Sequence, residues 1–450
     1  MLSFFRKLRR DKRGNVLVLA AAAMPLVVGS AGLATDTIQW ALWKRQLQRA
    51  ADSAAIAGVR DRLQSADTAG VEAAVLKDLE INQHTGIALH EDPVIDFPED
   101  TGEMTLQVKV EVAIQKRLTF TSMFIEPPVI KATATAAAVP GAGDYCVVSL
   151  EHTTAMGIEG SGNGSVETDC SWVTNSCATV AAMAKGSSTI YADVIAACGG
   201  IQESDNFHVN RYDPYAPPVK DPYAELNPDP DDFECAKASV RERGEDVERT
   251  ITLTEDSVMS QFFGADGVQT KNCFAGISVG SNRTLTLPPG VYYIDGGNID
   301  IQGTLVGEGV TLVLTNSSTD ENAPIGNFNA NAKGNVRLTA PTEGKWAGMA
   351  IYQDRRAQDP PDLFSGSMPA NSPNKINGNS VSYVTGVIYF PNQQITYNGN
   401  GDGAWRCTQL VARRIQFSGN NRSRLTTDED ICEGTGVESP EGTPRVRLIA

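Results

Sequence analysis

Long apolar runs, closely spaced cysteine pairs and histidines are scarce in this sequence, and each scarcity removes a class of protein. Only residues 16–34 form a long uncharged apolar run, so a polytopic membrane protein is not expected. The eight cysteines include no C-x-x-C pair, which is the spacing that zinc sites favour. The four histidines include no H-E-x-x-H sequence, so a zinc metalloprotease is not supported. We expect no metal ion and no cofactor.

Positive charge is also scarce beyond the first residues. The 450-residue chain has 38 Lys and Arg against 54 Asp and Glu, which gives a net charge of −16. Residues 1–14 carry six basic residues and one aspartate, or +5, so the remainder carries −21. Nucleic-acid phosphates need Lys and Arg. The acidic surface therefore argues against a nucleic-acid partner and fits a soluble, secreted region.

The order of basic residues and apolar run predicts a membrane anchor. A bilayer core is crossed by about 20 apolar residues, which form a helix because lipid offers no hydrogen bonds. Positive charge stays on the cytoplasmic side. We therefore expect a single-pass protein with a basic cytoplasmic segment at 1–14 and everything after Ala34 across the membrane. A cleaved secretory signal is the alternative, although its apolar region is usually about 7–15 residues long.

The apolar run continues into a segment of helical composition, residues 36–59, and we assign 15–60 to one transmembrane and stalk helix. One face of the stalk repeats at three- or four-residue steps. This face consists of Trp43, Leu47, Ala50, Ala54 and Ala57. Small side chains allow close helix–helix approach. The face is expected either to pack on helices of other subunits or to pack on its own domain.

The sequence from residue 9 to residue 58 carries a recognisable pattern. It reads RRDKRGNVLVLAAAAMPLVVGSAGLATDTIQWALWKRQLQRAADSAAIAG, with Asp36 after the apolar segment and AADSAA at 50–55. This pattern resembles the TadE/TadG-like proteins of Flp (Tad, tight adherence) pilus assembly. The resemblance implies a bacterial inner-membrane protein with a periplasmic C-terminal part. It also implies other Tad/Flp pilus proteins as partners, both pilin-like subunits and the inner-membrane platform.

Two features depart from that family pattern. Type IV-like pilins carry glutamate at the fifth position after the cleavage glycine, and counting from Gly14 this position is Leu19. An uncleaved anchor of the TadG type is therefore expected. TadG-type members often carry a von Willebrand A module with a D-x-S-x-S metal site, which this sequence lacks. The resemblance thus implies a TadG-like anchor with a different head and does not imply metal-dependent adhesion.

Residues 61–140 predict a small α+β module, which the resemblance also implies. A helix is expected at 67–82, where Val71 and Leu79 fall on one side. Residues 105–114 alternate strictly between apolar and polar side chains, as in a half-buried strand. A weaker alternation follows at 129–139. The module is therefore helix, strand, strand.

Short β-rich pieces and abundant Gly, Asn, Ser and Thr mark residues 141–450 as a second, mainly-β head. Short strands separated by turns that Gly and Asn favour indicate stacked coils. Residues 284–318 are the clearest run, and they resemble the pectin-lyase-like right-handed parallel β-helix as a fold and not as an enzyme. A β-sandwich is the alternative, because no fixed period can be counted.

All eight cysteines lie in this head. An even number in an exported region predicts disulfides, which the bacterial periplasm supports. Of the many possible connectivities, pairing in sequence order is the simplest. The predicted pairs are Cys146–Cys170, Cys177–Cys198, Cys235–Cys273 and Cys407–Cys432.

The stretch 205–232 is rich in Pro, Asp and Tyr. Prolines stiffen such a stretch and clustered carboxylates keep it solvated, so we expect a solvated linker or excursion loop. Calcium binding is the alternative, although the EF-hand pattern is absent. The candidate ligands are Asp213, Asp221, Asp229, Asp231 and Asp232.

Catalytic patterns are weak, and we expect no enzyme and no catalytic residue. Residues 276–280 match G-x-S-x-G around Ser278, but all four histidines precede it, so we interpret the match as a turn. A glycan-cleaving β-helix would need two opposed carboxylates. Its candidates are Asp295, Asp300 and Asp354, with Arg355 and Arg356 nearby. Turn-forming and rim positions are the usual role of such residues.

Aromatic residues gather in the last third of the chain, either as buried stacks or as a ligand face. They are Trp346, Tyr352, Tyr383, Tyr389, Phe390, Tyr397 and Trp405. Taken together, the sequence predicts a minor-pilin-like component of a Flp/Tad pilus system. It would act in pilus biogenesis or adhesion through a disulfide-stapled head, at the inner membrane or at the cell surface, with its Ala-rich stalk packed on pilin-like helices. The alternative is an envelope-anchored carbohydrate-active or carbohydrate-binding β-helix protein with a surface or glycan ligand.

Overall fold

The chain forms two compact units, residues 1–140 with 444–450 (the N-terminal unit) and residues 141–443 (the head). The computed structural model describes residues 15–449 except 65–66, 84–87, 103, 140, 142–143, 244, 332, 360–367, 369–371, 378–381, 398–403, 420–421 and 438–443. The predicted cytoplasmic segment 1–14, with Gly14, and His84 therefore lie outside the described residues. The sequence assigned the last residues to the head, whereas 444–450 fold with the N-terminal unit.

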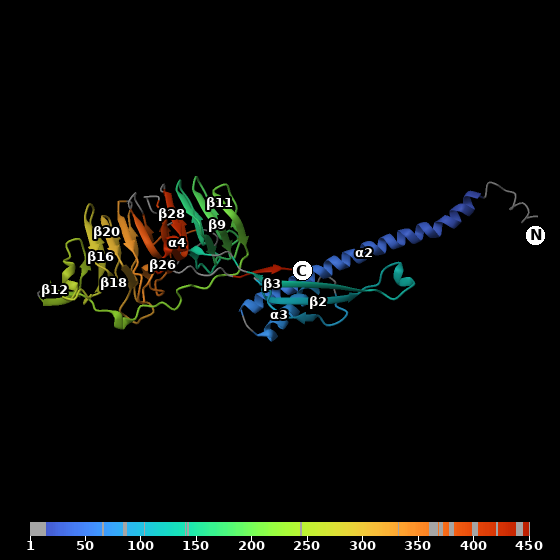
Figure 1. Ribbon diagram of the computed structural model, residues 1–450, viewed down its shortest axis with the longest axis horizontal. Coiled ribbons are helices and arrows are strands. Elements are labelled where there is room, and N and C mark those ends of the chain that lie inside the picture. The colour runs from blue at the N-terminus through green and yellow to red at the C-terminus, as the bar shows by residue number, and fades with distance from the viewer. Residues whose placement is uncertain are drawn as a thin grey trace, which may run out of the picture. The chain divides into compact units, whose positions relative to one another are not determined.

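Helix α2 (Asn15–Gln64) runs without interruption through the predicted membrane segment and the predicted stalk (Figure 1). Because a helix rises by about 1.5 Å per residue, its 50 residues span about 75 Å. Pro25 lies inside the helix. Large side chains of the first half are exposed, Leu26 by 76% and Met24 by 64%, whereas Leu47 and Val59 are fully buried. The helix therefore has a free apolar half and a packed half.

The packed half of α2 and helix α3 (Thr68–Gln83) cover an antiparallel sheet. Its strands are β1 (Val94–Asp96), β2 (Thr105–Gln115), β3 (Val129–Val139) and β29 (Arg445–Leu448), in this order. The predicted helix and both predicted strands of this module are present. The alternation in β2 buries Val108, Val110 and Val112 with the helices and leaves Lys109 and Glu111 only partly buried.

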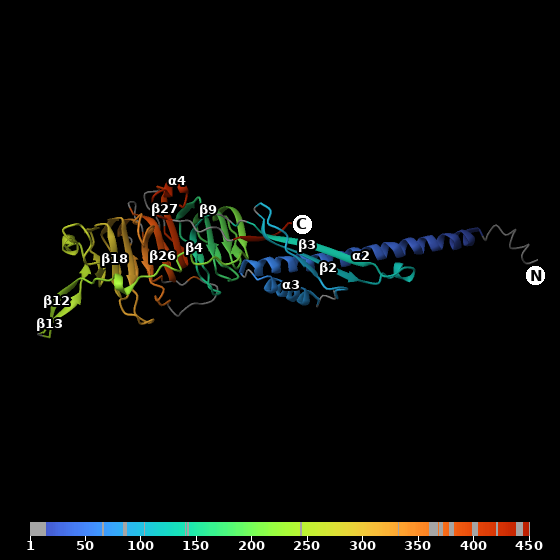
Figure 2. The same cartoon turned by 60° about the horizontal axis from the view of Figure 1, so that its bottom comes forward.

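The head consists mainly of short parallel strands stacked in three ladders (Figures 1 and 2). The first ladder runs β11 (Phe207–Pro214), β9 (Thr189–Ala197), β7 (Ser171–Thr174), β4 (Tyr145–Ser149), β27 (Arg406–Phe417), β26 (Tyr383–Tyr397), β24 (Met349–Gln353), β21 (Val310–Thr315), β18 (Gly290–Asp295) and β15 (Cys273–Phe274). The second runs β10 (Ile201–Gln202), β8 (Ala182–Ala184), β5 (Ile158–Gly160), β27, β26, β25 (Asn374–Ile376), β22 (Phe328–Ala330), β19 (Ile299–Ile301), β16 (Gly276–Val279) and β14 (Thr252–Leu253).

The third ladder has two stretches. They are β9, β6 (Ser165–Thr168) and β28 (Arg422–Thr426), and then β26, β23 (Asn335–Thr339), β20 (Thr304–Glu308) and β17 (Thr284–Leu287). Parallel pairing throughout the ladders fits the predicted stacked coils and disfavours the β-sandwich, whose sheets are antiparallel. Apolar residues in register fill the interior, for example Ile277, Ile299 and Phe328 on successive coils.

The chain fills the ladders in two directions. Strands β4, β7, β9 and β11 follow one another outward in the first ladder. The chain then crosses to Cys235, which pairs with Cys273 of β15 at the opposite end of the same ladder. From there it winds back until β27 pairs with β4, where Leu410 is opposite Val147. We call the pairing of β27 with β4 and β5 the seam. It joins two strand edges that would otherwise be unpaired.

The crossing segment, residues 215–235, is here called the strap. Its apolar side chains Val219, Tyr223, Leu226 and Phe233 are partly buried against a core cluster of the head. Residues 207–214 are already strand β11. The strap forms no strand and more than half of its residues are exposed, as predicted for a solvated excursion loop, but its apolar side chains pack on the head. The reason is that apolar side chains lie between the prolines, while the carboxylates of the Pro230–Asp232 turn (η3) stay exposed.

The remaining elements of the head are short. They are the antiparallel hairpin β12 (Lys237–Glu242) and β13 (Glu245–Thr250), the 3-10 turn η4 (Met259–Phe262) and helix α4 (Glu429–Cys432). All four predicted disulfides are present, so all eight cysteines are paired. Among the clustered aromatics, Tyr352, Tyr389 and Phe390 are fully buried, whereas Trp405 is 37% exposed. The rings of Tyr352 and Tyr389 stack with their centroids 5.1 Å apart, so the buried-stack interpretation holds for this pair.

Candidate functional site

The Ala-rich face of α2 packs on its own sheet. Ala51, Ala54 and Ala55 are fully buried, and Ala50 is nearly so, in a cluster with β2 and β3. At Gly58 an added Cβ would lie 2.9 Å from both Val108 and Val75, so the small residues serve close packing within the unit. Of the two alternatives for this face, the one in which it packs on its own domain is correct. The face is not available to other subunits.

Among the described residues, α2 is the one helix that is long and apolar enough to cross a membrane, and only 6% of its most apolar 18-residue stretch is buried. Its exposed apolar surface extends past the predicted span to Ile38, Trp40 and Leu42. Ring side chains such as Trp40 are typical of membrane–water interfaces. This helix is consistent with membrane anchoring.

Asp36 is the one buried acidic group among the described residues of α2, with 3% of its surface exposed. Its carboxylate accepts hydrogen bonds from the Phe120 amide at 3.0 and 3.1 Å, from the Thr121 hydroxyl at 2.6 Å and from the Thr121 amide. These donors belong to the loop between β2 and β3, which forms the short turn η2 (Thr121–Met123). We call this arrangement the Asp36 clasp.

The clasp stabilises the charged form of Asp36. Hydrogen bonds to a carboxylate favour its charged form, and Asp36 accepts such bonds from Phe120 and Thr121. The aspartate that the family pattern places after the apolar segment therefore has a structural task. It ties a loop of the following module to the end of the apolar run.

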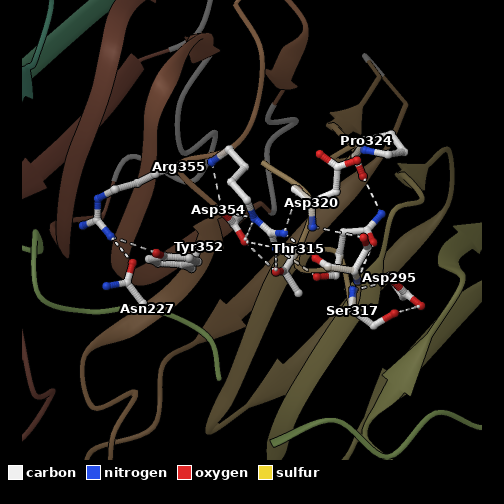
Figure 3. Close-up of polar contacts among 12 residues, drawn as sticks. Asn227, Asp295, Thr315, Ser317, Asp320, Pro324, Tyr352, Asp354 and Arg355 are labelled. Atoms are coloured by element: carbon white, nitrogen blue, oxygen red, sulfur yellow. Dashed lines mark hydrogen bonds and ion pairs between the residues drawn. The ribbon is translucent and has the colours of Figure 1, made fainter. Parts of the chain in front are cut away.

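Asp354 and Asp295, two of the three candidate carboxylates in the head, are engaged in local contacts (Figure 3). Asp354 accepts hydrogen bonds from the Thr315 hydroxyl at 2.7 Å and from the Arg356 guanidinium at 2.8 Å. Asp295 accepts from the amide and hydroxyl of Ser317 at 2.8 and 2.9 Å. Both residues join neighbouring turns of the head.

The electrostatics of Asp354 disfavour it as a general acid. Burial would raise the pKa of Asp354, but hydrogen bonds from Arg356 and Thr315 and the charge of Arg356 hold it below the ordinary value. A glycosidase acid must stay protonated near neutral pH, which requires a raised pKa. Asp354 and Arg356 therefore form a structural ion pair.

Asp300, the third candidate, lies apart from these contacts on β19. It lines a hollow of about 180 Å³ together with Asn298, Asn327, Asn329 and Lys375. The Asn329 amide lies 3.4 Å from the Asp300 carboxylate. Among the described lining residues the hollow offers hydrogen-bonding groups and no aromatic ring on which a sugar would stack.

Arg355 fastens the strap. Its guanidinium donates to the Asn227 side chain at 2.7 Å (Figure 3). It also donates to the Leu226 carbonyl at 2.8 Å and to the Tyr223 carbonyl, and it forms an ion pair with Asp221. Tyr352 beneath it donates its hydroxyl to the same Leu226 carbonyl at 2.7 Å. All of these partners except Tyr352 lie in the strap.

Tyr389 completes this contact by donating to Asp221 at 2.6 Å. Burial, followed by the charge of Asp221, raises the pKa of Tyr389, so its phenol stays protonated. Two of the other calcium candidates are engaged elsewhere: Asp229 caps η3 and Asp232 pairs with Lys345 at 2.8 Å. Asp221, Asp229 and Asp232 are therefore held by different partners, and the contacts described do not bring them together around one site.

A buried ionic cluster that sequence reasoning missed joins the seam. Arg414 of β27 is 1% exposed and contacts Glu151, which follows β4 and is fully buried. Arg413 lies 3.1 Å from Glu151, and Asp359 accepts from Arg414. About 260 residues separate Glu151 from the two arginines, so no local sequence pattern could have predicted that they form a cluster.

Ser278 does not lie in a turn. Residues Gly276–Val279 form strand β16, and Ser278 is exposed opposite Asp300 of β19. The turn interpretation is therefore wrong, because the small residues around Ser278 fit the tight spacing between coils. A hydrolase elbow requires a strand, a sharp turn and a helix, and β16 is followed by strand β17. The group Cys235, Cys273 and Asp295 also has metal-site spacing, but its two sulfurs form a disulfide.

Comparison with known families identifies one match. The model of a family described as putative Flp pilus-assembly TadE/G-like matches residues 14–61, which is almost the whole of α2. No curated protein and no solved structure matches the chain. The resemblance seen in residues 9–58 is thereby confirmed, while no family match covers the head. Residues 14–61 are thus similar to a Flp pilus-assembly-associated family.

Proposed function

We propose that this protein is a membrane-anchored, pilin-like component of the TadG type in a Flp/Tad pilus system. It acts in pilus biogenesis or adhesion through its β-rich head and has no enzymatic activity. One observation carries the proposal: the residues that match the TadE/G-like family coincide with α2, an exposed apolar helix that continues into a packed stalk.

The proposed topology is that of a single-pass protein of the bacterial inner membrane. Basic residues before α2 favour a cytoplasmic N-terminus by the positive-inside rule. The N-terminal unit beyond the membrane and the head would then lie in the periplasm, or at the cell surface if the protein enters the pilus. Four disulfides support an oxidising compartment.

Contacts with pilin-like subunits and the inner-membrane platform would use the free half of α2, because the Ala-rich face of the packed half is already buried. The free half also carries small residues, and nothing lies within 4 Å of a Cβ built on Gly29. Small residues let membrane helices approach closely. The assembly surface would then lie inside the bilayer.

The head is proposed to be a right-handed parallel β-helix stapled by its disulfides. Its three parallel ladders support stacked coils, and parallel crossovers are right-handed in about 98% of cases. The engagement of Asp354, Asp295 and Arg355 in structural contacts supports a non-enzymatic head.

A carbohydrate-active or carbohydrate-binding envelope protein is the second candidate. The polar hollow around Asp300 and Asn329 favours it, since converging amide and carboxylate groups suit a sugar hydroxyl. The absence of an aromatic ring among the described lining residues weighs against it. The two candidates predict different phenotypes.

A deletion strain separates them. Loss of surface pili in electron micrographs, restored by the intact gene and equally by Asp300→Asn, is the expected result. Normal pili combined with altered binding or breakdown of a polysaccharide panel would contradict the pilus role and support the second candidate. Release of reducing ends that Asp300→Asn abolishes would identify an enzyme.

A further inference from the structure

The loop between β2 and β3 presents large apolar side chains to solvent. Met123 and Phe124 are each 75% exposed, and Ile125 is 60% exposed. The rings of Phe120 and Phe124 lie 5.6 Å apart. We call residues 118–126 the tip. A group of exposed apolar side chains in one short loop marks an interaction surface rather than ordinary surface scatter.

The tip is fastened to α2 at three points. The Asp36 clasp holds the amides of Phe120 and Thr121. The Phe120 ring lies so close to Gly32 that an added Cβ would be 2.6 Å from it. The Thr119 hydroxyl lies 3.1 Å from the Gln39 side chain. These contacts fix the height of the tip along the helix axis, and both views show the loop beside α2 (Figures 1 and 2).

That height coincides with the end of the apolar run. The run ends at Ala34, two residues before Asp36. Leu33 is 56% exposed just below the clasp, and Trp40 is 44% exposed about one turn above it. If α2 spans a bilayer, any loop pinned to Gly32 and Asp36 lies at the boundary between acyl chains and headgroups.

We propose that the tip inserts into the outer interface of the same bilayer that α2 spans. Phe124, Met123 and Ile125 lie among the upper acyl chains, and the exposed Arg117 faces the phosphates of anionic lipids. The inference rests on the proposed membrane anchoring. The occupant is lipid because the bilayer surrounds this height of α2 whether or not another protein is present.

A protein that contacts the membrane through both α2 and the tip is oriented more tightly than one that contacts it through a helix alone. A single helix can rotate about its axis and tilt in the bilayer. With Asp36 joining the tip to the helix, the sheet of the N-terminal unit is held at a fixed height and rotation relative to the membrane. The clasp therefore acts as a positioning device for whatever the unit carries.

Photo-cross-linking of the full chain tests this inference. The protein is reconstituted in vesicles of phosphatidylethanolamine and phosphatidylglycerol with p-benzoylphenylalanine at one position, and adducts are identified by mass spectrometry. Position 124 should yield lipid adducts several-fold above position 81, where Ile81 of α3 is also 60% exposed. Position 24, within the apolar run, is the positive control.

The outcomes separate the tip from the anchor. If position 24 gave lipid adducts but position 124 gave no more than position 81, the inference would be overturned and the membrane anchor would stand. Adducts at 124 to a second copy of the chain would replace lipid by a protein partner and overturn it as well. An unlabelled position 24 would refute the anchoring itself, and the inference with it.

The clasp is tested in the same assay. Asp36→Ala should lower lipid adducts at 124 several-fold and leave those at 24 unchanged, because the tip loses its fastening while α2 stays in the bilayer. Thr35→Ala is the matched control, since the Thr35 hydroxyl bonds only to carbonyls of its own helix in the contacts described. Unchanged labelling at 124 in Asp36→Ala would refute the positioning role of Asp36.

Discussion

Removing one charge at the seam should destabilise the whole head. Glu151 is fully buried and faces two guanidinium groups, Arg413 at 3.1 Å and Arg414 in closer contact. Glu151→Gln keeps the shape of the side chain and removes its charge. The buried Arg414 and the partly buried Arg413 are then left with Asp359 as their one described carboxylate partner.

The expected cost is large because the cluster is shielded from water. Breaking a buried ion pair by removing one partner costs about 3–5 kcal/mol, since the remaining charge is desolvated without compensation. The unfolding entropy of a domain is about 2.1 cal/mol/K per residue, so each kcal/mol lowers the melting temperature of the 303-residue head by about 1.6 °C, and the expected shift is about 5–8 °C. An exposed ion pair contributes only about 0–1 kcal/mol.

Thermal unfolding of the full chain in detergent, followed by near-ultraviolet circular dichroism at one heating rate, measures the shift. The matched control is Glu242→Gln, because Glu242 pairs with Arg249 on the exposed hairpin β12–β13. This control should unfold within a few degrees of the wild type. If Glu151→Gln also unfolded there, the seam would not depend on the buried cluster and the reasoning would be refuted.

Three further predictions follow from the same structure. Burial would raise the pKa of Glu151, but the hydrogen bond from Thr153 and the contacts with Arg413 and Arg414 outweigh this effect and hold the pKa below its ordinary value of 4.5. The ionised Glu151 therefore stabilises the folded head above pH 4.5, and this stabilisation is lost as the pH falls through the lowered pKa. The melting difference between wild type and Glu151→Gln should therefore shrink below pH 4.5, and a constant difference would contradict this assignment. Gly58→Leu should destabilise the N-terminal unit by about 1–3 kcal/mol through overpacking against Val75 and Val108, measured as faster proteolysis of that unit, whereas Gly29→Leu, with nothing within 4 Å, should not. Arg355→Met should release the strap and increase trypsin cleavage after Lys220. Cleavage at the wild-type rate would show that Arg355 does not hold the strap. Arg249→Met, on the exposed hairpin, is the control.

Local patterns predicted the N-terminal unit well. The strict alternation of residues 105–114 became β2, and the helical periodicities became α2 and α3, because neighbours in the sequence decide which face of an element is apolar. The disulfides were also predictable, since each joins cysteines 21 to 38 residues apart within neighbouring coils or turns. Short-range information was sufficient in all of these cases.

Contacts between distant segments were not predictable in this way. The prolines and carboxylates of the strap suggested a solvated segment, yet Tyr223 and Leu226 are drawn onto the head by a cluster of rings and by Arg355. Arg355 itself was noticed only as a neighbour of Asp354. Its partners lie about 130 residues earlier in the chain, so composition could not reveal them.

The Asp36 clasp and the tip show the same difference between what neighbouring residues predict and what distant contacts decide. Asp36 was recognised through the family pattern, but its role depends on donors 84 and 85 residues away in the loop before β3. The sequence does contain a signal for the tip: Phe120, Met123, Phe124 and Ile125 interrupt the polar composition expected of a loop between two strands. Its meaning emerges only when the clasp places those side chains beside the end of the apolar run.

Because of the path of the chain, folding of the head should be more cooperative than folding of an ordinary repeat protein. In a repeat protein each coil contacts its neighbours in sequence, so the array can begin to form anywhere. Here the strap runs from β11 to Cys235, which pairs with Cys273 of β15 at the opposite end of the first ladder, while β4 and β27 meet within this ladder. Until β27 arrives, β4 has an unpaired edge and Glu151 lacks both arginines. The first coils of the head are therefore completed by the last ones, and a chain that ends before residue 406 leaves the seam open.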